Sequence, residues 1–400
     1  MKKLFIPVFL LTIFFTAEVF SQVTKAPVSV PAASSGDATA TVSTAPPKLS
    51  EAGEKKEAMF DQMFAKFIES GKSIAALQKE YENASPTRQY EIVKEAEPLM
   101  DATRKLYMEI VPVAIDLFKT ERLTTKKTLN DFLLDYVDGL TAQDDYEKAY
   151  SVATMLWMGG LQKDHPELME LTGITAFMVN FTATAEDCFK QARAAGKLSP
   201  SGAMYASLVP YYKEAYAAEK KIQEAEAQAN DLPQVLIQTT KGDITVELFE
   251  NEAPNTVANF ISLIKKDFYK GKTFHRVIPG FMAQGGCPDG TGGGGPGYCI
   301  KCETGNPNAR KHFRGTLSMA RTDKKDTGGS QFFITFVPTQ HLDGVHTAFG
   351  RIIKGWDVLA KLERIDPDRK IPGQEPDKII NIKILRTRQH EYVPETLPAR

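Results

Sequence analysis

The segment FHRVIPGFMAQGG, at 274–286, combines a guanidinium with amide and apolar side chains at short spacing. Its apolar runs on either side of a Pro-Gly pair predict a strand, a tight turn and a second strand. This hairpin would carry Arg276 on one arm and Met282 and Gln284 on one face of the other arm. Because a guanidinium stays charged and donates hydrogen bonds in a rigid fork, Arg276 is a candidate for electrostatic stabilisation.

Two later segments offer side chains that would complete such a site. In GSQFFI, the residues Gln331 and Phe333 fall on the same side of a predicted strand, and LDGVHTAFG supplies Leu342 and His346. If the three segments meet, they form an apolar cup with one guanidinium, amides and one imidazole. This set contains no obvious nucleophile, no paired carboxylates and no metal-ligand spacing. It therefore excludes most hydrolytic mechanisms and indicates binding with electrostatic stabilisation.

These segments, with LSMAR between them, resemble the cyclophilin family of peptidyl-prolyl cis/trans isomerases over residues 232–388. The resemblance implies an enzyme that rotates X–Pro bonds without a covalent intermediate and needs neither a cofactor nor a metal. It also implies that the substrates are proline-containing peptides and unfolded polypeptides.

The resemblance carries residue roles with it. The implied catalytic residues are Arg276, Gln284 and His346. The implied substrate-binding residues are Phe281, Met282, Ala320, Arg321, Gln331, Phe333, His341 and Leu342. Arg276 would donate to the prolyl nitrogen, four of the apolar side chains would hold the proline ring, and His275 would support the site from beneath. His341 stands where many eukaryotic cyclophilins carry a tryptophan that contacts cyclosporin, which predicts weak inhibition by that drug.

A glycine-rich run and three cysteines lie close to the predicted site in the sequence. Residues 290–295 match the pattern G-x-G-x-x-G, but prolines flank the run where a helix should open, so we predict a loop beside the site and no nucleotide. Cys287 could form a disulfide with Cys299 or Cys302 in an oxidising compartment. Free thiols and a metal site are the alternatives, and the sequence does not choose among them.

The first residues have the pattern of a secretory signal peptide. Two lysines precede an apolar run from Leu4 to Ala17, and the small residue Ser21 follows. Cleavage after Ser21 would leave Gln22 as the mature start. A retained anchor is the alternative, but Glu18 keeps the run short of the roughly 20 residues that span a bilayer. We expect an exported bacterial protein, periplasmic or secreted, with no stable membrane insertion after cleavage.

Changes in the sequence pattern divide the chain into five parts. Residues 1–21 are the signal peptide, 22–48 a flexible linker, 49–231 an all-α region of about seven helices, 232–388 the isomerase domain and 389–400 a tail. In the isomerase domain, two predicted helices among many short strands favour a closed antiparallel β-barrel capped by helices.

One stretch of the helical region resembles a tetratricopeptide-type hairpin. Small and aromatic residues fall at the spacings of its packing positions, namely Gly173, Ala185, Phe189 and Ala192. A peptide-binding helical array is one interpretation, and an ordinary helical bundle is the other. The region is also a candidate to bind a protein partner. Gly139 is predicted to end one of its helices.

Charge is balanced over the whole chain but not along it. The 400 residues contain 49 Lys and Arg against 50 Asp and Glu, so nucleic acid is not expected as a partner. Residues 1–231 carry a net charge of −7, with 25 basic and 32 acidic side chains, whereas 232–388 carry +7, with 23 and 16. These opposite charges predict that the two parts attract each other and that salt weakens the attraction.

Taken together, the sequence predicts a cyclophilin-type isomerase that assists the folding of exported proteins. The helical region would then be a recognition or chaperone module. The alternative is a helical scaffold or holdase whose cyclophilin domain only binds proline-containing segments. Arg276 favours the enzyme, since a pure binding module does not need it.

Overall fold

The computed structural model describes residues 49–121, 126–369 and 373–399. The predicted signal peptide and linker lie outside the described residues and stay predictions. The chain divides into two compact units, one made of residues up to 136 with 158–161, and the other of 137–157 with 162–400. The boundary at 231/232, predicted from the change in sequence pattern, also stays a prediction.

The first unit is a long helical hairpin closed by aromatic side chains. Helices α3 (Glu51–Asn83) and α4 (Pro86–Glu121) pair, and the beginning of α5 (Lys127–Ala142) packs on them. The Phe132 ring of α5 meets Phe60 and Tyr107 edge to face, with centroids 5.9 and 5.5 Å apart. Such pairs add about 0.5–1.5 kcal/mol to the burial of the rings.

Four helices of the second unit precede its sheet. They are α6 (Tyr146–Met158), α7 (Glu167–Met178), α8 (Thr182–Ala194) and α9 (Pro200–Ala229). Helices α7 and α8 pack closely because Gly173 leaves no side chain in the way: a Cβ there would lie 2.8 Å from the Phe189 ring. The predicted small-against-aromatic packing is confirmed, whereas a repeated helical array stays a prediction.

The expected number of helices before residue 231 is confirmed for the described part of the chain, which contains seven there. The prediction that Gly139 ends a helix is wrong. Helix α5 continues to Ala142, because glycine inside a helix costs only about 1 kcal/mol relative to alanine. The chain turns instead at Asp144, whose φ is +61°. Aspartate tolerates this left-handed conformation better than most residues.

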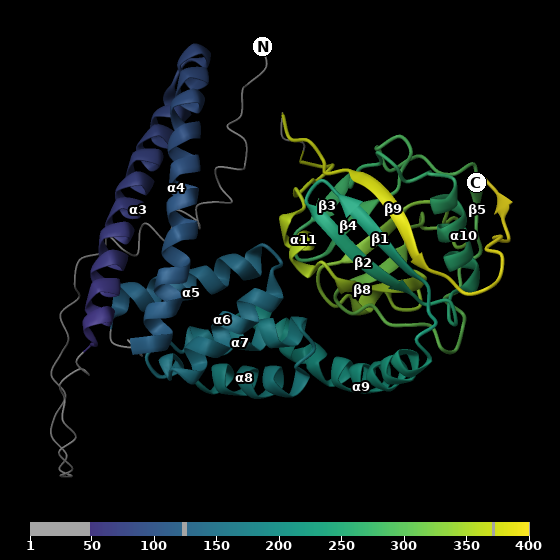
Figure 1. Cartoon of the computed structure of the whole chain (residues 1–400), viewed down its shortest axis with the longest axis horizontal. Coiled ribbons are helices and arrows are strands. Elements are labelled where there is room, and N and C mark those ends of the chain that lie inside the picture. The colour runs from purple at the N-terminus through teal and green to yellow at the C-terminus, as the bar shows by residue number, and fades with distance from the viewer. Residues whose placement is uncertain (1–48, 122–125, 370–372, 400) are drawn as a thin grey trace, which may run out of the picture. The chain divides into compact units, whose positions relative to one another are not determined.

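Eight strands of the second unit form one antiparallel sheet (Figure 1). Their order across the sheet is β3-β4-β7-β6-β8-β2-β1-β9. In chain order, the strands are β1 (Gln234–Thr239), β2 (Gly242–Leu248), β3 (Arg276–Ile278), β4 (Met282–Gly285), β6 (Thr316–Met319), β7 (Phe332–Thr335), β8 (Ala348–Lys354) and β9 (Ile379–Arg386). Every second residue of β1 is buried, as expected for a strand with one face on a core.

The sheet is a curled half-barrel, and no ladder joins its outer strands β3 and β9 in the described residues. An isolated bridge between Thr273 and Lys378 links the segments that precede these two strands. The antiparallel fold predicted from the sequence is confirmed, with less complete closure than expected. The edge strand β3 has only three residues, all of them paired with β4.

Two helices lie at opposite ends of the curled sheet, α10 (Pro254–Lys265) and α11 (Trp356–Lys361) (Figure 1). The final residues pack on the same domain, where β10 (Leu397–Pro398) pairs with β5 (Tyr298–Cys299). The Tyr392 hydroxyl donates to Glu250 at 2.9 Å. None of the helices in the described ranges is long and apolar enough to cross a membrane.

Helix α9 joins the helical part of this unit to the sheet through buried charges. Arg310 is ion-paired with Glu219 and Glu226, and Arg351 is 2.7 Å from Glu226. The Arg310 side chain is only 1% exposed and the Glu226 side chain 5%. Acidic side chains of the first part of the sequence and basic side chains of the second therefore meet here in buried pairs, which salt screens much less than exposed pairs. The docking of the two parts as a whole and its weakening by salt stay predictions.

Candidate active site

A short hairpin carries the predicted donor. Strands β3 and β4 place Arg276 directly opposite Gln284, and the turn between them contains Gly280 with a φ of +64°. Glycine adopts this left-handed conformation without a steric penalty, so the turn can be tight. The half-buried Arg276 side chain has its Nη1 atom 3.7 Å from the sulfur of Met282. No carboxylate within the described ranges lies close enough to Arg276 for an ion pair.

The predicted proline cup is a small apolar cluster of its own. Met282, Phe333 and Leu342 form a buried group separate from the main core, and the partly buried Phe281 packs against it. The Arg276 guanidinium lies 5.6 Å from the centre of the Phe281 ring. The tertiary structure therefore gathers side chains from three distant segments around one guanidinium, as the sequence predicted.

The two predicted glutamines are linked, and one of them anchors the glycine-rich loop. Gln284 donates to the Gln331 side-chain oxygen at 2.9 Å. The Gln331 amide nitrogen in turn donates to the carbonyls of Gly292 and Gly294, each at 2.8 Å. The glycine run is thus a loop beside the site, and Gln284 is held in place opposite Arg276 on the adjacent strand.

His346 borders the cup with its imidazole against Phe333. The two rings meet edge to face with centroids 5.3 Å apart. Nδ1 of His346 lies 3.0 Å from the Met319 carbonyl, which can only accept, so Nδ1 carries the proton in this contact. Burial lowers the pKa of His346, and Arg321 nearby lowers it further. The imidazole is therefore neutral at pH 7.

We expect His346 to make stability depend on pH. Its unfolded pKa is near 6.5 and its folded pKa is lower, so below pH 6.5 the unfolded chain takes up a proton that the folded chain does not. Stability from this residue is full above pH 6.5 and falls as the pH drops, by at most about 1.4 kcal/mol per pH unit. Urea unfolding at pH 7.5 and 5.5 should show a smaller pH effect in His346→Gln.

His390 provides the matched control, because its pKa is raised by the Glu391 carbonyl and by Glu250. Its folded state keeps a proton that the unfolded state loses, so its contribution to stability is lost as the pH rises. His390→Gln should therefore steepen the loss of stability at low pH. The same pH effect in the parent and His346→Gln would contradict the role of His346.

The remaining predicted residues lie around the cup in different ways. His341 is exposed and stacks on Phe281 with ring centroids 5.7 Å apart, and its predicted effect on cyclosporin binding stays a prediction. His275 is buried beneath the site, where burial lowers its pKa. The Ala320 amide already donates to the Gln331 carbonyl at 3.0 Å, so a peptide would have to pair with other backbone groups of Ala320 and Arg321.

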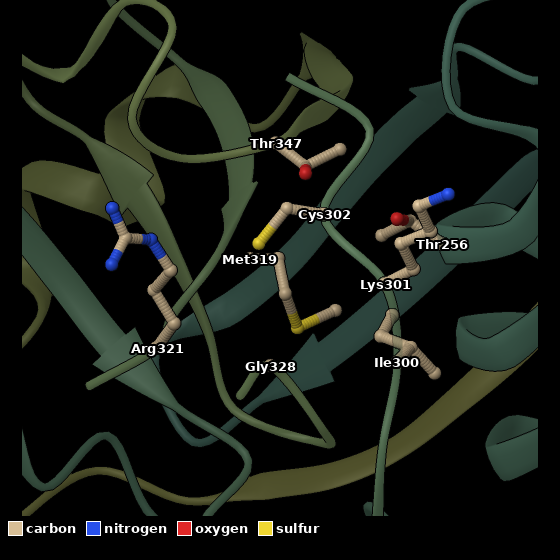
Figure 2. A pocket seen from close by; sticks show the side chains of 8 residues that line it. All are labelled: Thr256, Ile300, Lys301, Cys302, Met319, Arg321, Gly328 and Thr347. Carbon is tan, nitrogen blue, oxygen red and sulfur yellow. The ribbon is translucent and has the colours of Figure 1, made fainter. Parts of the chain in front are cut away.

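Met319 and Arg321 line a small hollow with a volume of about 10 Å³, which holds about one water molecule (Figure 2). None of the four apolar side chains of the cup lines it, so it is distinct from the cup. The half-buried Cys302 lines it, with its sulfur 3.3 Å from the Asp326 amide. Cys302, Cys287 and Cys299 are all free thiols in the structure.

Two residues that support the cup were not singled out by the sequence analysis. The His312 ring stacks under Phe333 with an interplanar angle of 13°, and its Nδ1 is 2.8 Å from Asp343. Asp343 follows Leu342 directly in LDGVH, so its position next to a predicted site residue could have identified it as part of the site. His312 lies in no segment that the sequence analysis had marked.

Comparisons with known proteins agree with this geometry. The family model for cyclophilin type peptidyl-prolyl cis-trans isomerases matches residues 234–385. A peptidyl-prolyl cis-trans isomerase of Synechococcus elongatus is 59% identical over 120 residues, which are 30% of this chain and 80% of the relative. The chain belongs to the cyclophilin-type peptidyl-prolyl cis-trans isomerase family. The expected isomerase activity is thereby confirmed.

Other matches cover the same cyclophilin domain. Peptidyl-prolyl cis-trans isomerase B of Bacillus subtilis is 55% identical over 129 residues, which are 32% of this chain and 88% of the relative. The crystal structure of a Cryptosporidium parvum cyclophilin has 36% identity and a TM-score of 0.36, and the match covers 39% of this chain and 99% of that one. The residues matched by the family model begin after α9, so the helices belong to this cyclophilin in addition to the shared domain.

Proposed function

We propose that this cyclophilin isomerises X–Pro bonds in exported polypeptides outside the cytoplasm of a bacterium. The observation that carries the catalytic part is the guanidinium of Arg276, which borders the apolar cluster and has no acidic partner among the described residues. The location rests on the N-terminal pattern of two lysines, an apolar run and a small residue. A protein partner of the helical region stays a prediction.

The chemistry requires no covalent step. Rotation about an X–Pro bond is slow because the amide resonance must be broken, with a barrier of about 18–20 kcal/mol. When the bond twists, the prolyl nitrogen regains its lone pair and becomes a hydrogen-bond acceptor. In the proposed mechanism Arg276 donates to that nitrogen, an interaction that the planar ground state does not offer. Only such differential binding accelerates the reaction.

The other residues of the site hold the substrate in place for this step. Phe281, Met282, Phe333 and Leu342 would surround the pyrrolidine ring and fix it while the preceding carbonyl rotates. Gln284 lies opposite Arg276 and would restrict the guanidinium to the side that faces the cup. Arginine suits the task because it keeps its proton throughout.

The proposal is tested with a protein whose refolding is limited by proline isomerisation, a phase of tens to hundreds of seconds without catalyst. We expect the full chain to accelerate this slow phase, and Arg276→Ala to leave it almost unchanged. The chain recovered from bacteria should lie in the periplasm or medium and begin at Gln22. Equal acceleration by both proteins would contradict the role of Arg276, and no acceleration by either would indicate a holdase instead. A protein that stays in the cytoplasm would refute export.

A further inference from the structure

We propose that the helical part of the second unit positions the proline cup through two side chains, Asp144 and Tyr211. Each belongs to the helical region and contacts a different wall of the site in the cyclophilin domain. The inference concerns how the isomerase activity is supported, and it does not depend on export or on the choice of client.

Asp144 holds the turn of the hairpin that carries Arg276. Its Oδ1 accepts a hydrogen bond from the Gly280 amide at 2.9 Å, and its Oδ2 is 2.8 Å from the Arg364 guanidinium. The residue is only 1% exposed and lies at the left-handed turn after α5. Arg364 lies in turn over the Phe336 ring, 4.7 Å from its centre. The turn between β3 and β4 is thus tied to a buried carboxylate from outside the sheet.

A buried carboxylate of this kind has little freedom to move. Burial raises the pKa of Asp144, and Arg364 and the Gly280 amide act against that rise. Because a buried charge is costly without its partners, these contacts determine the position of the carboxylate closely. The Asp144 carboxylate therefore holds the Gly280 turn in one position. Both Arg276 and Met282 are within four residues of this turn. A displacement of about 1 Å at a catalytic group can lower a rate about 100-fold.

Tyr211 holds the opposite wall, through Asp343. The Tyr211 hydroxyl, on α9, donates to Asp343 Oδ2 at 2.6 Å. The other oxygen of Asp343 accepts from the His312 backbone amide at 2.8 Å and is 2.8 Å from the His312 ring. His312 also contacts the Ser318 hydroxyl at 2.9 Å and stacks beneath Phe333. A continuous chain of contacts therefore runs from α9 to the floor of the cup.

The charge state of Asp343 supports this arrangement. Burial alone would raise its pKa, but hydrogen bonds from His312 and Tyr211 hold the pKa of Asp343 below its usual range. The carboxylate is therefore ionised and accepts hydrogen bonds from both sides. If the Tyr211 hydroxyl is removed, one oxygen of this buried carboxylate loses its donor, and the orientation of His312 and Phe333 is less restricted.

Because Asp144 and Tyr211 contact different walls of the cup, we expect their loss to change different kinetic constants. The Asp144 contact lies next to the strand of Arg276, so its loss should misalign the donor and lower kcat. The Tyr211 contact supports the ring beneath Phe333, so its loss should loosen the cup and raise KM. A purely structural role would lower the thermal stability and leave both kinetic constants of the folded protein unchanged.

The experiment uses the full chain and a short proline peptide, which is too small to engage a separate recognition surface. Asp144→Gly removes the carboxylate and suits the left-handed backbone, and we expect kcat to fall five- to tenfold with KM within twofold of the parent. Tyr211→Phe removes one hydroxyl, and we expect KM to rise three- to fivefold with little change in kcat. The Gly280 amide signal in an NMR spectrum should shift in Asp144→Gly alone.

Matched controls exist for both changes. Asn180→Gly alters another residue with positive φ in the helical part, and Tyr216→Phe removes another hydroxyl from α9. Both should keep the parent's kinetics. If Asp144→Gly fails to fold, Asp144→Asn keeps an acceptor for the Gly280 amide but loses the ion pair with Arg364, so a smaller fall in kcat, of two- to threefold, is expected. Kinetic constants within twofold of the parent in folded Asp144 and Tyr211 variants would overturn the inference, whereas an inactive parent would instead refute the activity itself.

Discussion

Replacing Arg276 by alanine is expected to lower kcat/KM for a proline peptide by about 100- to 1,000-fold. A loss of this size is typical when an enzyme loses one fixed hydrogen-bond donor that stabilises the transition state. The loss should fall mainly on kcat, because the planar ground state offers the guanidinium no comparable acceptor. A peptide assay that follows the conversion of the cis form, with the variant at up to 100-fold higher concentration, measures this range.

Two further variants show whether the loss in Arg276→Ala is specific to this guanidinium. Arg276→Lys keeps the charge but loses the rigid fork, so an intermediate activity is expected. Arg369→Ala removes an exposed arginine, 88% exposed as a side chain, and should leave the kinetics unchanged. If Arg276→Ala kept more than half of the parent's activity, the guanidinium would have no part in the chemistry, and binding of the ring by the apolar cluster alone would have to explain catalysis.

The second large effect is expected on stability. Arg310→Ala should reduce the free energy of unfolding of the second unit by about 3–5 kcal/mol, the usual result of leaving buried charges without their partner. Arg310 is paired with Glu219 and Glu226 of α9, and all three side chains are less than 10% exposed. Its removal leaves two buried carboxylates with Arg351 as their remaining cationic partner. Urea unfolding followed by tryptophan fluorescence, with Trp356 on α11 as a reporter in this unit, measures the change.

An exposed ion pair provides the matched control for this loss. Lys361→Ala, which breaks an exposed pair with Asp357, should change stability by only a few tenths of a kcal/mol. A loss below about 1 kcal/mol in Arg310→Ala would show that the buried pairs do not hold α9 on the sheet.

The sequence by itself determined the identity of the site and of the fold around it. The residue types in three segments, together with their resemblance to the cyclophilin family, predicted a guanidinium beside an apolar cup, and the structure brings Arg276, Gln284, Phe333 and Leu342 together. Such local patterns are readable because strand side chains alternate strictly, so a residue's place in a strand decides which face it occupies. The helices of the N-terminal region were readable for the same kind of reason, from their apolar periodicity.

Local sequence patterns did not predict the end of helix α5, because contacts with distant residues determine where the chain turns. Gly139 has the sequence signal of a helix end, yet the helix continues and the chain turns at Asp144. The turn occurs there because the Asp144 carboxylate binds the Gly280 amide and the Arg364 guanidinium, and both residues lie more than 130 positions away in the chain. No local propensity contains that information.

Only the tertiary structure showed which residues of the helical region contact the cyclophilin domain. The sequence showed an acidic part and a basic part and suggested an attraction sensitive to salt. The structure shows that in the second unit oppositely charged side chains meet in a few buried pairs, Glu219 and Glu226 with Arg310, and that Asp144 and Tyr211 contact the walls of the cup. Net charge is a sum over the whole surface, whereas burial and hydrogen-bond geometry depend on which side chains meet after folding. For this reason the residues that meet around the cup could be predicted from the sequence, and the contacts made to them by the helices could not.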